Sequence, residues 1–405
     1  MKKLLLSIGL APIALFAQDI TYDEFSMNPG YENMVFYSMD SGVVGEEIMA
    51  SWDLAFDVRS MGSSVRINGG QGTVLYNAGD LDEWENIDDT FIDMTAKLSQ
   101  LRNDNSSWSS GAFSQGGDGM FDLGWGVYDI VTHIITSDKT FVIALPDGTW
   151  KKIAILSLQS GTYSFQYANL DGTDFVEDQL SKSDYPDKLL AFYSIGDQSA
   201  LDLEPNENWD FLFLRYVEQI QPEVYYGVTG ALVNPSTGVQ MLEGLADPFT
   251  DGEMDADLLN YDANSVGYDW KSYAGGTYSL ADDRCYFVQT NAGSQWRLVF
   301  TGFEGSTTGN IEIGKILETG VSVANAERLN WNVFPNPARE NSEIFVQGNF
   351  EVEDASLTNM AGVVVYTTAL NAWSGTIHLQ DVSPGMYILN LNTDQGIINH
   401  RLLIQ

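Results

Sequence analysis

Acidic side chains make up most of the residues that could do chemistry in this chain. Two loops place carboxylates at alternate or neighbouring positions: residues 80–89, which begin DLDE and end DD, and residues 251–257, DGEMDAD. Oxygen ligands at such positions suit calcium, so Asp251, Asp255 and Asp257 form a candidate calcium site. Neither loop has the glycine and glutamate positions of an EF-hand, and a solvated surface loop is the alternative interpretation. Calcium bound there would have a structural role.

Few residues are available for nucleophilic or zinc chemistry. The chain has three histidines, His133, His378 and His400, and a single cysteine, Cys285. One histidine and one cysteine ahead of the C-terminal segment cannot fill a usual zinc site. Cys285 lies in a strand-like apolar run, where we expect a buried, unreactive thiol. Carboxylates are plentiful, but no pair stands out as the acid and base of a glycosidase. We therefore expect a protein that is not an enzyme.

Composition and charge exclude several classes of protein. Of the 405 residues, 44% are hydrophobic and 12% aromatic, which is enough to fill the cores of two or three domains. The 56 acidic residues against 19 basic ones give a formal net charge of −37. A chain this acidic repels nucleic acid and anionic lipid surfaces.

The first residues have the pattern of a secretory signal peptide. A basic start, MKK, precedes the apolar residues 4–10, and LFA at residues 15–17 provides a small residue for cleavage before Gln18. The apolar stretch is too short to anchor a membrane protein, and no later stretch has the length of a membrane span.

The last residues, 330–405, carry a combination of short motifs. PNP occupies positions 335–337, VVV at 363–365 follows a glycine, GMY occupies 385–387, and the chain closes on a basic and apolar run at 400–404. This segment resembles the C-terminal sorting domain of the type IX secretion system of the Bacteroidota. The resemblance implies a small immunoglobulin-like β-sandwich that is handled by the secretion machinery. It also implies a secreted or outer-surface location, reached through the periplasm.

The region between these two ends is a degenerate duplication. VFYSM at 35–39 and WDLAF at 52–56 are followed, in the same order, by AFYSI at 191–195 and WDFLF at 209–213. Short runs rich in β-branched and aromatic residues, bounded by Gly, Asn and Asp, predict strands throughout, and residues 163–167 alternate as a half-buried strand does. We expect a mostly β protein in which each copy is a β-sandwich or open barrel.

The first copy resembles the HmuY-like family of secreted haem-binding proteins, also from the Bacteroidota. The resemblance covers about residues 30–180 and has a weaker echo at 188–313. It rests on WDLAF at 52–56, NGG at 68–70 and a strand pair at 141–153 that contains DGTWKK.

Members of this family hold haem iron between two histidines or, in some branches, two methionines. His378 and His400 belong to the sorting segment, so the region between the signal peptide and residue 330 has only His133 and cannot provide a pair of histidines. The resemblance therefore implies His133 and Met120 as the ligands, and a pair of methionines that includes Met61 is also chemically reasonable. An ordinary strand histidine and an ordinary loop methionine are the alternative.

Together these features predict five segments. They are a signal peptide at 1–17, HmuY-like copies at 18–180 and 181–315, a linker at 316–329, and a sorting domain at 330–405. The expected function is capture of haem or another tetrapyrrole at the cell surface. The alternative is a structural or adhesive surface module without a haem site, which the scarcity of histidine favours.

Overall fold

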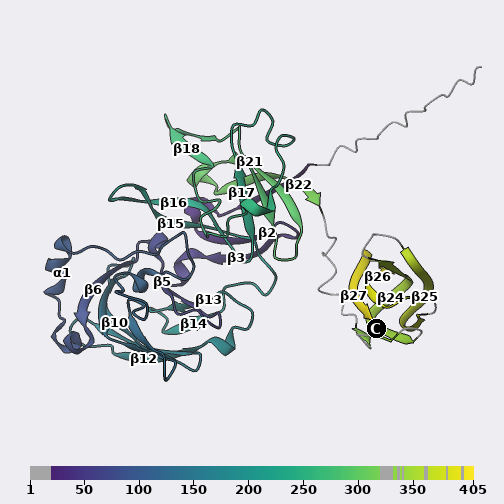
Figure 1. Cartoon of the computed structure of the whole chain (residues 1–405). Coiled ribbons are helices and arrows are strands. Elements are labelled where there is room, and N and C mark those ends of the chain that lie inside the picture. Colours follow the sequence, from purple (N-terminus) through teal and green to yellow (C-terminus); the bar gives the residue numbers. More distant parts are fainter. Residues whose placement is uncertain are drawn as a thin grey trace, which may run out of the picture. The chain divides into compact units, whose positions relative to one another are not determined.

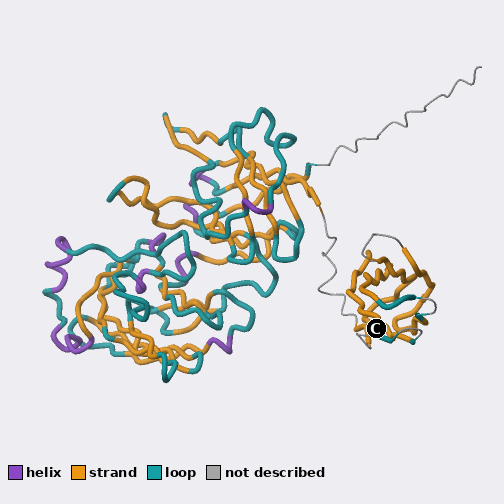
Figure 2. The backbone as a smooth tube through the Cα atoms, in the orientation of Figure 1, coloured by secondary structure: helices purple, strands orange, loops and turns teal. Residues whose placement is uncertain are grey.

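The computed structural model describes residues 20–319, 332–334, 338–339, 342–359, 364–379, 382–393 and 396–405. They form two compact units, the first extending to Glu318 and the second containing the described residues from 332 onward. Both units consist mainly of β-strands, which confirms the predicted fold class (Figure 1, Figure 2). The predicted signal peptide lies outside the described residues. No described helix is both long enough and apolar enough to cross a membrane.

The first unit contains four larger antiparallel sheets and a two-stranded one, and we number the larger sheets I to IV in the order in which they pack. Sheet I has seven strands: β6 (Val74–Asp80), β7 (Gly126–Asp129), β8 (Ile134–Ser137), β9 (Lys139–Ala144), β10 (Trp150–Gln159), β11 (Thr162–Asn169) and β12 (Val176–Ser181). Sheet II has, in order of pairing, β14 (Ser199–Leu201), β13 (Leu190–Ser194), β4 (Leu54–Asp57) and β5 (Val65–Ile67). Sheet III has β3 (Gly42–Ile48), β2 (Asn33–Ser38), β15 (Phe211–Gln221) and β16 (Val224–Val233). Sheet IV has β1 (Thr21–Ser26), β22 (Asn310–Thr319), β21 (Gln295–Phe303), β20 (Cys285–Gln289) and β17 (Gly238–Leu242).

Two smaller elements complete the first unit. Strands β18 (Lys271–Ala274) and β19 (Thr277–Leu280) form a separate exposed hairpin. The helix α1 (Phe91–Met94) has four residues, and of these only Phe91 is buried. So short a helix with one buried side chain depends on tertiary packing rather than on its own stability.

Three hydrophobic cores separate the four sheets. Leu54 and Phe56 of β4 belong to the core between sheets I and II, whereas Ala55 between them belongs to the core between sheets II and III. A third core fills the space between sheets III and IV. Sheets II and III are thus covered on both faces, which explains why their strands read as continuous apolar runs. By contrast, β11 in the outer sheet I alternates between buried and partly exposed residues, as predicted for positions 163–167.

The two sequence copies exchange their first hairpins. In sheet III, Tyr37 of the first copy pairs with Phe211 of the second, and in sheet II, Tyr193 of the second copy pairs with Leu54 of the first. These two pairs join equivalent positions of the duplicated motifs, so sheets II and III are assembled in the same way. The predicted boundary between residues 180 and 181 therefore does not separate two self-contained sandwiches. Equivalent strands of the two copies have the same apolar pattern and the same backbone hydrogen-bonding groups. A strand can therefore pair with a strand of the other copy as well as with one of its own copy.

The predicted linker also begins later than expected. Strand β22 continues to Thr319, so positions 316–319 of the predicted linker are part of sheet IV. Residues 320–331 lie outside the described residues.

The second unit has a core of its own. Its strands are β23 (Asn332–Phe334), β24 (Glu343–Asn359), β25 (Val364–His378), β26 (Gly385–Thr393) and β27 (Gly396–Ile404). Leu357, Leu389 and Leu402 from three of these strands are fully buried together. The motif prolines at 335 and 337 lie outside the described residues.

Candidate functional site

His133 lies in the turn of the β7–β8 hairpin. Its backbone has a positive φ of 60°, and its amide donates to the carbonyl of Asp129 at 2.8 Å. The carboxylate of Asp129 accepts hydrogen bonds from the amides of Val131 (2.7 Å) and Thr132 (3.0 Å), which fixes the turn. Left-handed backbone is uncommon outside glycine, although histidine adopts it more often than most residues. The turn therefore holds His133 in a defined and sparsely populated conformation.

The imidazole of His133 is exposed and oriented by one neighbour. The hydroxyl of Tyr128 lies 2.6 Å from Nδ1. This contact leaves the other ring nitrogen, Nε2, without a hydrogen-bond partner among the described residues. The arrangement can present one imidazole nitrogen to an external ligand.

Met120 lies on a segment that runs beside the same hairpin. The amide of Tyr128 donates to the carbonyl of Phe121 at 2.8 Å, and the two rings are 6.2 Å apart. Met120 is 86% exposed, and at the hairpin tip Ile130 and Val131 are 63% and 82% exposed. The structure therefore brings the two predicted haem ligands onto adjoining segments of one exposed, largely apolar surface. We call this surface, formed by residues 120–121 and 127–133, the His133 hairpin.

The predicted calcium ligands do not converge. Asp251 accepts hydrogen bonds from the backbone amides of Ala246 (3.1 Å) and Asp247 (3.0 Å), and Asp255 accepts one from the amide of Asp257 (3.1 Å). The carboxylates of Asp251 and Asp255 thus each fix a different part of the loop. Within the described parts of the chain no group of three or more His, Cys, Asp or Glu is placed to hold a metal ion. The calcium prediction at Asp251, Asp255 and Asp257 therefore has no support in the structure.

Cys285 is fully buried in β20. Burial raises the pKa of its thiol above the ordinary value. A buried thiol with a raised pKa forms little thiolate, so Cys285 is suited to packing rather than to nucleophilic chemistry.

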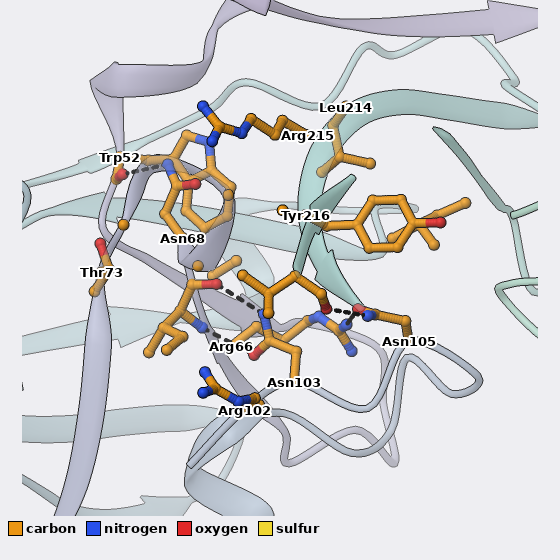
Figure 3. A pocket seen from close by; sticks show the side chains of 18 of the residues that line it. Trp52, Arg66, Asn68, Thr73, Arg102, Asn103, Asn105, Leu214, Arg215 and Tyr216 are labelled. Carbon is orange, nitrogen blue, oxygen red and sulfur yellow. Dashed lines mark hydrogen bonds between the residues drawn. The ribbon is translucent and has the colours of Figure 1, made fainter. Parts of the chain in front are cut away.

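A cavity of about 270 Å³ lies between sheets II and III, where the two halves of the first unit meet (Figure 3). The labelled side chains in Figure 3 come from the sheet II side (Trp52, Arg66, Asn68, Thr73), from the loop that follows α1 (Arg102, Asn103, Asn105) and from β15 (Leu214, Arg215, Tyr216). The NGG motif at 68–70 forms part of the wall. A Cβ atom at Gly70 would lie 1.9 Å from the carbonyl oxygen of Arg215, so glycine is required for the loop to approach β15 this closely.

Three residues of the cavity lining each have a buried polar atom without a hydrogen-bond partner among the described residues. These atoms are Trp52 Nε1, Asn68 Oδ1 and Thr73 Oγ1. The amide nitrogen of Asn68 donates to the carbonyls of Met49 (2.6 Å) and Trp52 (2.9 Å), which leaves Oδ1 as the unpaired end. Buried polar groups are nearly always paired, so three unpaired groups on residues of one cavity wall indicate a place for a polar ligand or ordered water.

The charge of the cavity lining is opposite to that of the chain. Arg66, Arg102 and Arg215 line it, and no aspartate or glutamate does. Arg66 donates to the carbonyls of Ser107 (2.9 Å) and Asp104 (3.1 Å). None of the three arginines forms an ion pair with a described residue. Arg102 donates to Oε1 of Gln100 and lies 4.3 Å from the centre of the Tyr225 ring, and Arg215 also lines the second hollow described below. None of these contacts neutralises the positive charge of the arginines.

A second hollow, which we call the tyrosine cleft, lies at the outer end of sheet III. It has a volume of about 850 Å³, and five tyrosines line it: Tyr31, Tyr226, Tyr268, Tyr273 and Tyr278. Lys271 at its floor donates to the carbonyl of Thr229 at 2.5 Å, and burial lowers the pKa of this lysine to about 7. Such a cleft offers aromatic faces and hydroxyl groups to a ligand or partner.

Analysis of the sequence alone found part of the cavity. It singled out Trp52 and the NGG motif, but as landmarks of a resemblance rather than as cavity walls. Arg66, Arg102 and Arg215 were missed, because they are far apart in the sequence and belong to no common motif. The rarity of basic residues, 19 against 56 acidic ones, was the signal that could have drawn attention to them.

Two protein families match the chain. The profile of the HmuY protein family matches residues 30–314, which is more than half of the chain. The profile of the secretion system C-terminal sorting domain matches residues 332–405.

Solved structures give weaker similarities. PorZ, an essential bacterial surface component of the type IX secretion system of Porphyromonas gingivalis, is 12% identical over 69% of this chain and 44% of its own, with a TM-score of 0.18. Dimeric latent PorU from Porphyromonas gingivalis is 10% identical over 67% of this chain and 31% of its own, with a TM-score of 0.16. The chain thus spans less than half the length of either protein, and the TM-scores are too low to relate the folds. No curated protein matches the chain.

Proposed function

The chain belongs to the HmuY protein family, and from this membership we propose that it captures haem or another tetrapyrrole at the outer surface of the cell. The C-terminal sorting domain directs its export by the type IX secretion system to the cell surface or the extracellular space. In this proposal the protein binds its ligand without transforming it.

The His133 hairpin is the observation that supports haem capture. Histidines that bind metals usually have their second ring nitrogen fixed by a hydrogen bond, which sets the orientation of the ring. The hydroxyl of Tyr128 provides such a contact to Nδ1 at 2.6 Å and leaves Nε2 for the iron. Around it, the exposed side chains of Ile130 and Val131 provide apolar surface for a flat, largely apolar macrocycle.

Met120 would be the second residue to hold the haem. Bound haem would supply an iron atom that accepts imidazole and thioether ligands, and a methionine ligand raises its reduction potential. The exposed side chain of Met120 and the imidazole of His133 lie on adjoining segments, which supports their pairing in this role. An open site of this kind suits capture from solution more than long-term storage.

The tyrosine cleft favours a second candidate function, an adhesive surface module without haem. Tyr226 and Tyr273 are each 65% exposed beside the cleft. Exposed tyrosines supply large contact areas with little loss of conformational entropy, and they are common in binding surfaces. In this alternative the protein would attach to a partner through the cleft, and the His133 hairpin would have no ligand.

Absorbance titration of haem into the secreted full-length protein distinguishes the two candidates. We expect a saturable one-to-one shift of the Soret band in the wild type. His133→Ala should weaken haem binding by about tenfold or more, because an axial ligand is lost, and Met120→Leu should change the spectrum of the reduced form. His378→Ala is the matched control, since His378 is also exposed but lies in the sorting domain.

Three outcomes would contradict haem capture at this hairpin. The first is a non-saturating response in both oxidation states, which would leave the adhesive module as the working function. The second is an unchanged affinity in His133→Ala, which would place any haem elsewhere. The third is an equal loss in His378→Ala, which would indicate non-specific coordination by surface histidines.

A further inference from the structure

The cavity between sheets II and III has a composition that the rest of the chain does not share. The protein has 56 acidic residues, yet none of them lines this cavity, whereas three arginines do. An arginine without a carboxylate partner is a strong site for an anion, because its guanidinium group can hold a carboxylate by two parallel hydrogen bonds.

Arg66 shows that the positive charge extends into the protein. Its side chain is buried and lies 5.1 Å from the centre of the Trp108 ring. Burial lowers its pKa to about 10, so it remains charged at neutral pH. Only carbonyl and amide oxygens, from Asp104, Asn105 and Ser107, accept its hydrogen bonds. A buried cation without a counter-ion is costly, and an anionic ligand would reduce that cost.

The duplication provides an internal precedent for the missing counter-ion. Trp52 of the first copy corresponds to Trp209 of the second, and both pack in the core between sheets II and III. The indole nitrogen of Trp209 donates to the buried carboxylate of Glu204 at 2.9 Å. Trp52 lines the cavity, and its buried indole nitrogen has no partner among the described residues. In the second copy a carboxylate of the protein fills this role, and in the first copy no described carboxylate does.

The remaining walls define the rest of the ligand. The rings of Trp52, Trp108 and Phe192 line the cavity, together with leucine side chains from both sheets. Such walls favour a flat apolar body. At about 270 Å³ the cavity lies below the roughly 300–1,000 Å³ of pockets that bury drug-sized ligands, so it suits a single-ring molecule and not a tetrapyrrole.

We propose that this cavity binds a small aromatic carboxylate. The carboxylate lies toward the arginines and accepts a hydrogen bond from Trp52 Nε1, and the ring lies among the aromatic and leucine side chains. Asn68 Oδ1 and Thr73 Oγ1 remain for hydroxyl groups on the ligand or for water. This site is separate from the His133 hairpin and does not depend on haem capture.

Calorimetric titration with matched acids and amides tests the proposal. The probes are benzoate and phenylacetate, compared with benzamide and phenylacetamide, which have the same shape without the charge. We expect saturable one-to-one binding of at least one acid and binding about tenfold or more weaker for its amide. The double variant Arg102→Gln/Arg215→Gln should weaken binding of that acid by about tenfold or more, because it removes two positive charges from the lining. Arg215 is exposed and Arg102 only partly buried, so we expect the variant to fold.

Controls separate loss of the site from loss of the fold. Arg66 is left unchanged because it is buried and bonded to backbone carbonyls. Arg339→Gln, an exposed arginine in the second unit, should bind the acid as the wild type does. The thermal midpoint of the double variant should stay within a few degrees of the wild type. The proposal is overturned if neither acid binds with a Kd below about 10 mM, if acid and amide bind equally, or if a folded double variant binds as tightly as the wild type.

Discussion

Each copy of the duplicated motif makes an equivalent hydrogen bond to the other copy. Asp53 accepts a hydrogen bond from the amide of Ile195 at 2.8 Å, and Asp210 accepts one from the amide of Met39 at 2.7 Å. In both cases an aspartate of one copy fixes the first hairpin of the other copy. The exchange of hairpins is therefore secured by the motif itself, at equivalent positions in sheets II and III.

The copies differ in what surrounds this shared arrangement. Trp209 has a protein carboxylate as its hydrogen-bond partner, whereas Trp52 faces the cavity. The loops that follow differ too: Gly70 of the NGG motif is buried against β15, while Ser236 in the corresponding loop of the second copy is exposed. Protein side chains thus complete the surroundings of Trp209, whereas Trp52 lies beside an internal space that both copies line. The shared core is therefore filled at one tryptophan and left open beside the other.

Gly70→Ala should produce the largest effect, because it acts where the two halves touch. The new methyl group would lie 1.9 Å from the carbonyl oxygen of Arg215, and backbone on both sides would have to move. We expect a loss of about 3 kcal/mol in the free energy of unfolding, at the upper end of overpacking effects. Equilibrium unfolding in urea measures it.

Gly72→Ala is the matched control for this variant. Gly72 has a φ of 103° but open space around its Cα, so it should lose only about 1 kcal/mol through backbone strain. Equal losses in the two variants would mean that the close approach to β15 is not what holds the halves together.

Asp210→Asn should change the pH dependence of stability. Burial raises the pKa of Asp210 to about 6, above the value of about 3.9 for an unfolded chain. The folded state therefore binds this proton more tightly than the unfolded state. The stability that this proton contributes is present below about pH 4 and is lost as the pH rises toward 6. We expect the wild type to lose about 2 kcal/mol through this group between pH 4 and 7, and the variant to lack that part of the slope.

Asp53→Asn tests whether the two copies are alike in this respect. Burial also raises the pKa of Asp53, but this side chain is only partly buried. Its contribution to the slope should therefore be smaller. Urea unfolding of both variants at a series of pH values measures the difference. Each variant removes one acidic group, so the effect of the protein's net charge is common to both. If Asp53→Asn changed the pH dependence of the unfolding free energy as much as Asp210→Asn does, the two carboxylates would be equally shielded from water.

The positions of the strands could be predicted well from the sequence, but the pairing of strands within the sheets could not. Apolar runs such as 54–56 and 211–213 identified the inner strands, because a strand covered on both faces has few polar positions. Their pairing was not predictable, since equivalent runs in the two copies have the same pattern. Either copy could pair with itself or with the other, and pattern alone does not distinguish these arrangements. Only the three-dimensional structure could identify the exchange.

The candidate sites divide in a similar way. The His133 hairpin could be proposed from sequence because its residues are close together in the chain and resemble a known family. The cavity could not be, because Arg66, Arg102 and Arg215 become neighbours only after the hairpins exchange. The acidic loop at 251–257 misled for the opposite reason: closeness in sequence suggested shared ligation, but the carboxylates of Asp251 and Asp255 accept hydrogen bonds from nearby backbone amides instead.

Replacing the two equivalent tryptophans tests the comparison most directly, although the effect is the smallest. Trp209→Phe removes a hydrogen bond to the buried carboxylate of Glu204, whereas Trp52→Phe removes no protein hydrogen bond. Both variants lose ring volume in the same core, so that cost is largely shared. We expect Trp209→Phe to be less stable than Trp52→Phe by about 1.5 kcal/mol in urea unfolding.

A double-mutant cycle with Glu204→Gln assigns this difference to the hydrogen bond. Glu204 also accepts the amides of Leu189 and Leu190 and is held beside Lys188, so it stays in place when the indole is removed. We expect a coupling energy of about 1 kcal/mol between Glu204 and Trp209, and none between Glu204 and Trp52. The contrary result would be equal losses of unfolding free energy in the two variants and no coupling of either tryptophan to Glu204. The hydrogen bond between Trp209 and Glu204 would then contribute nothing to stability. The unpaired indole nitrogen of Trp52 would then no longer distinguish its surroundings from those of Trp209.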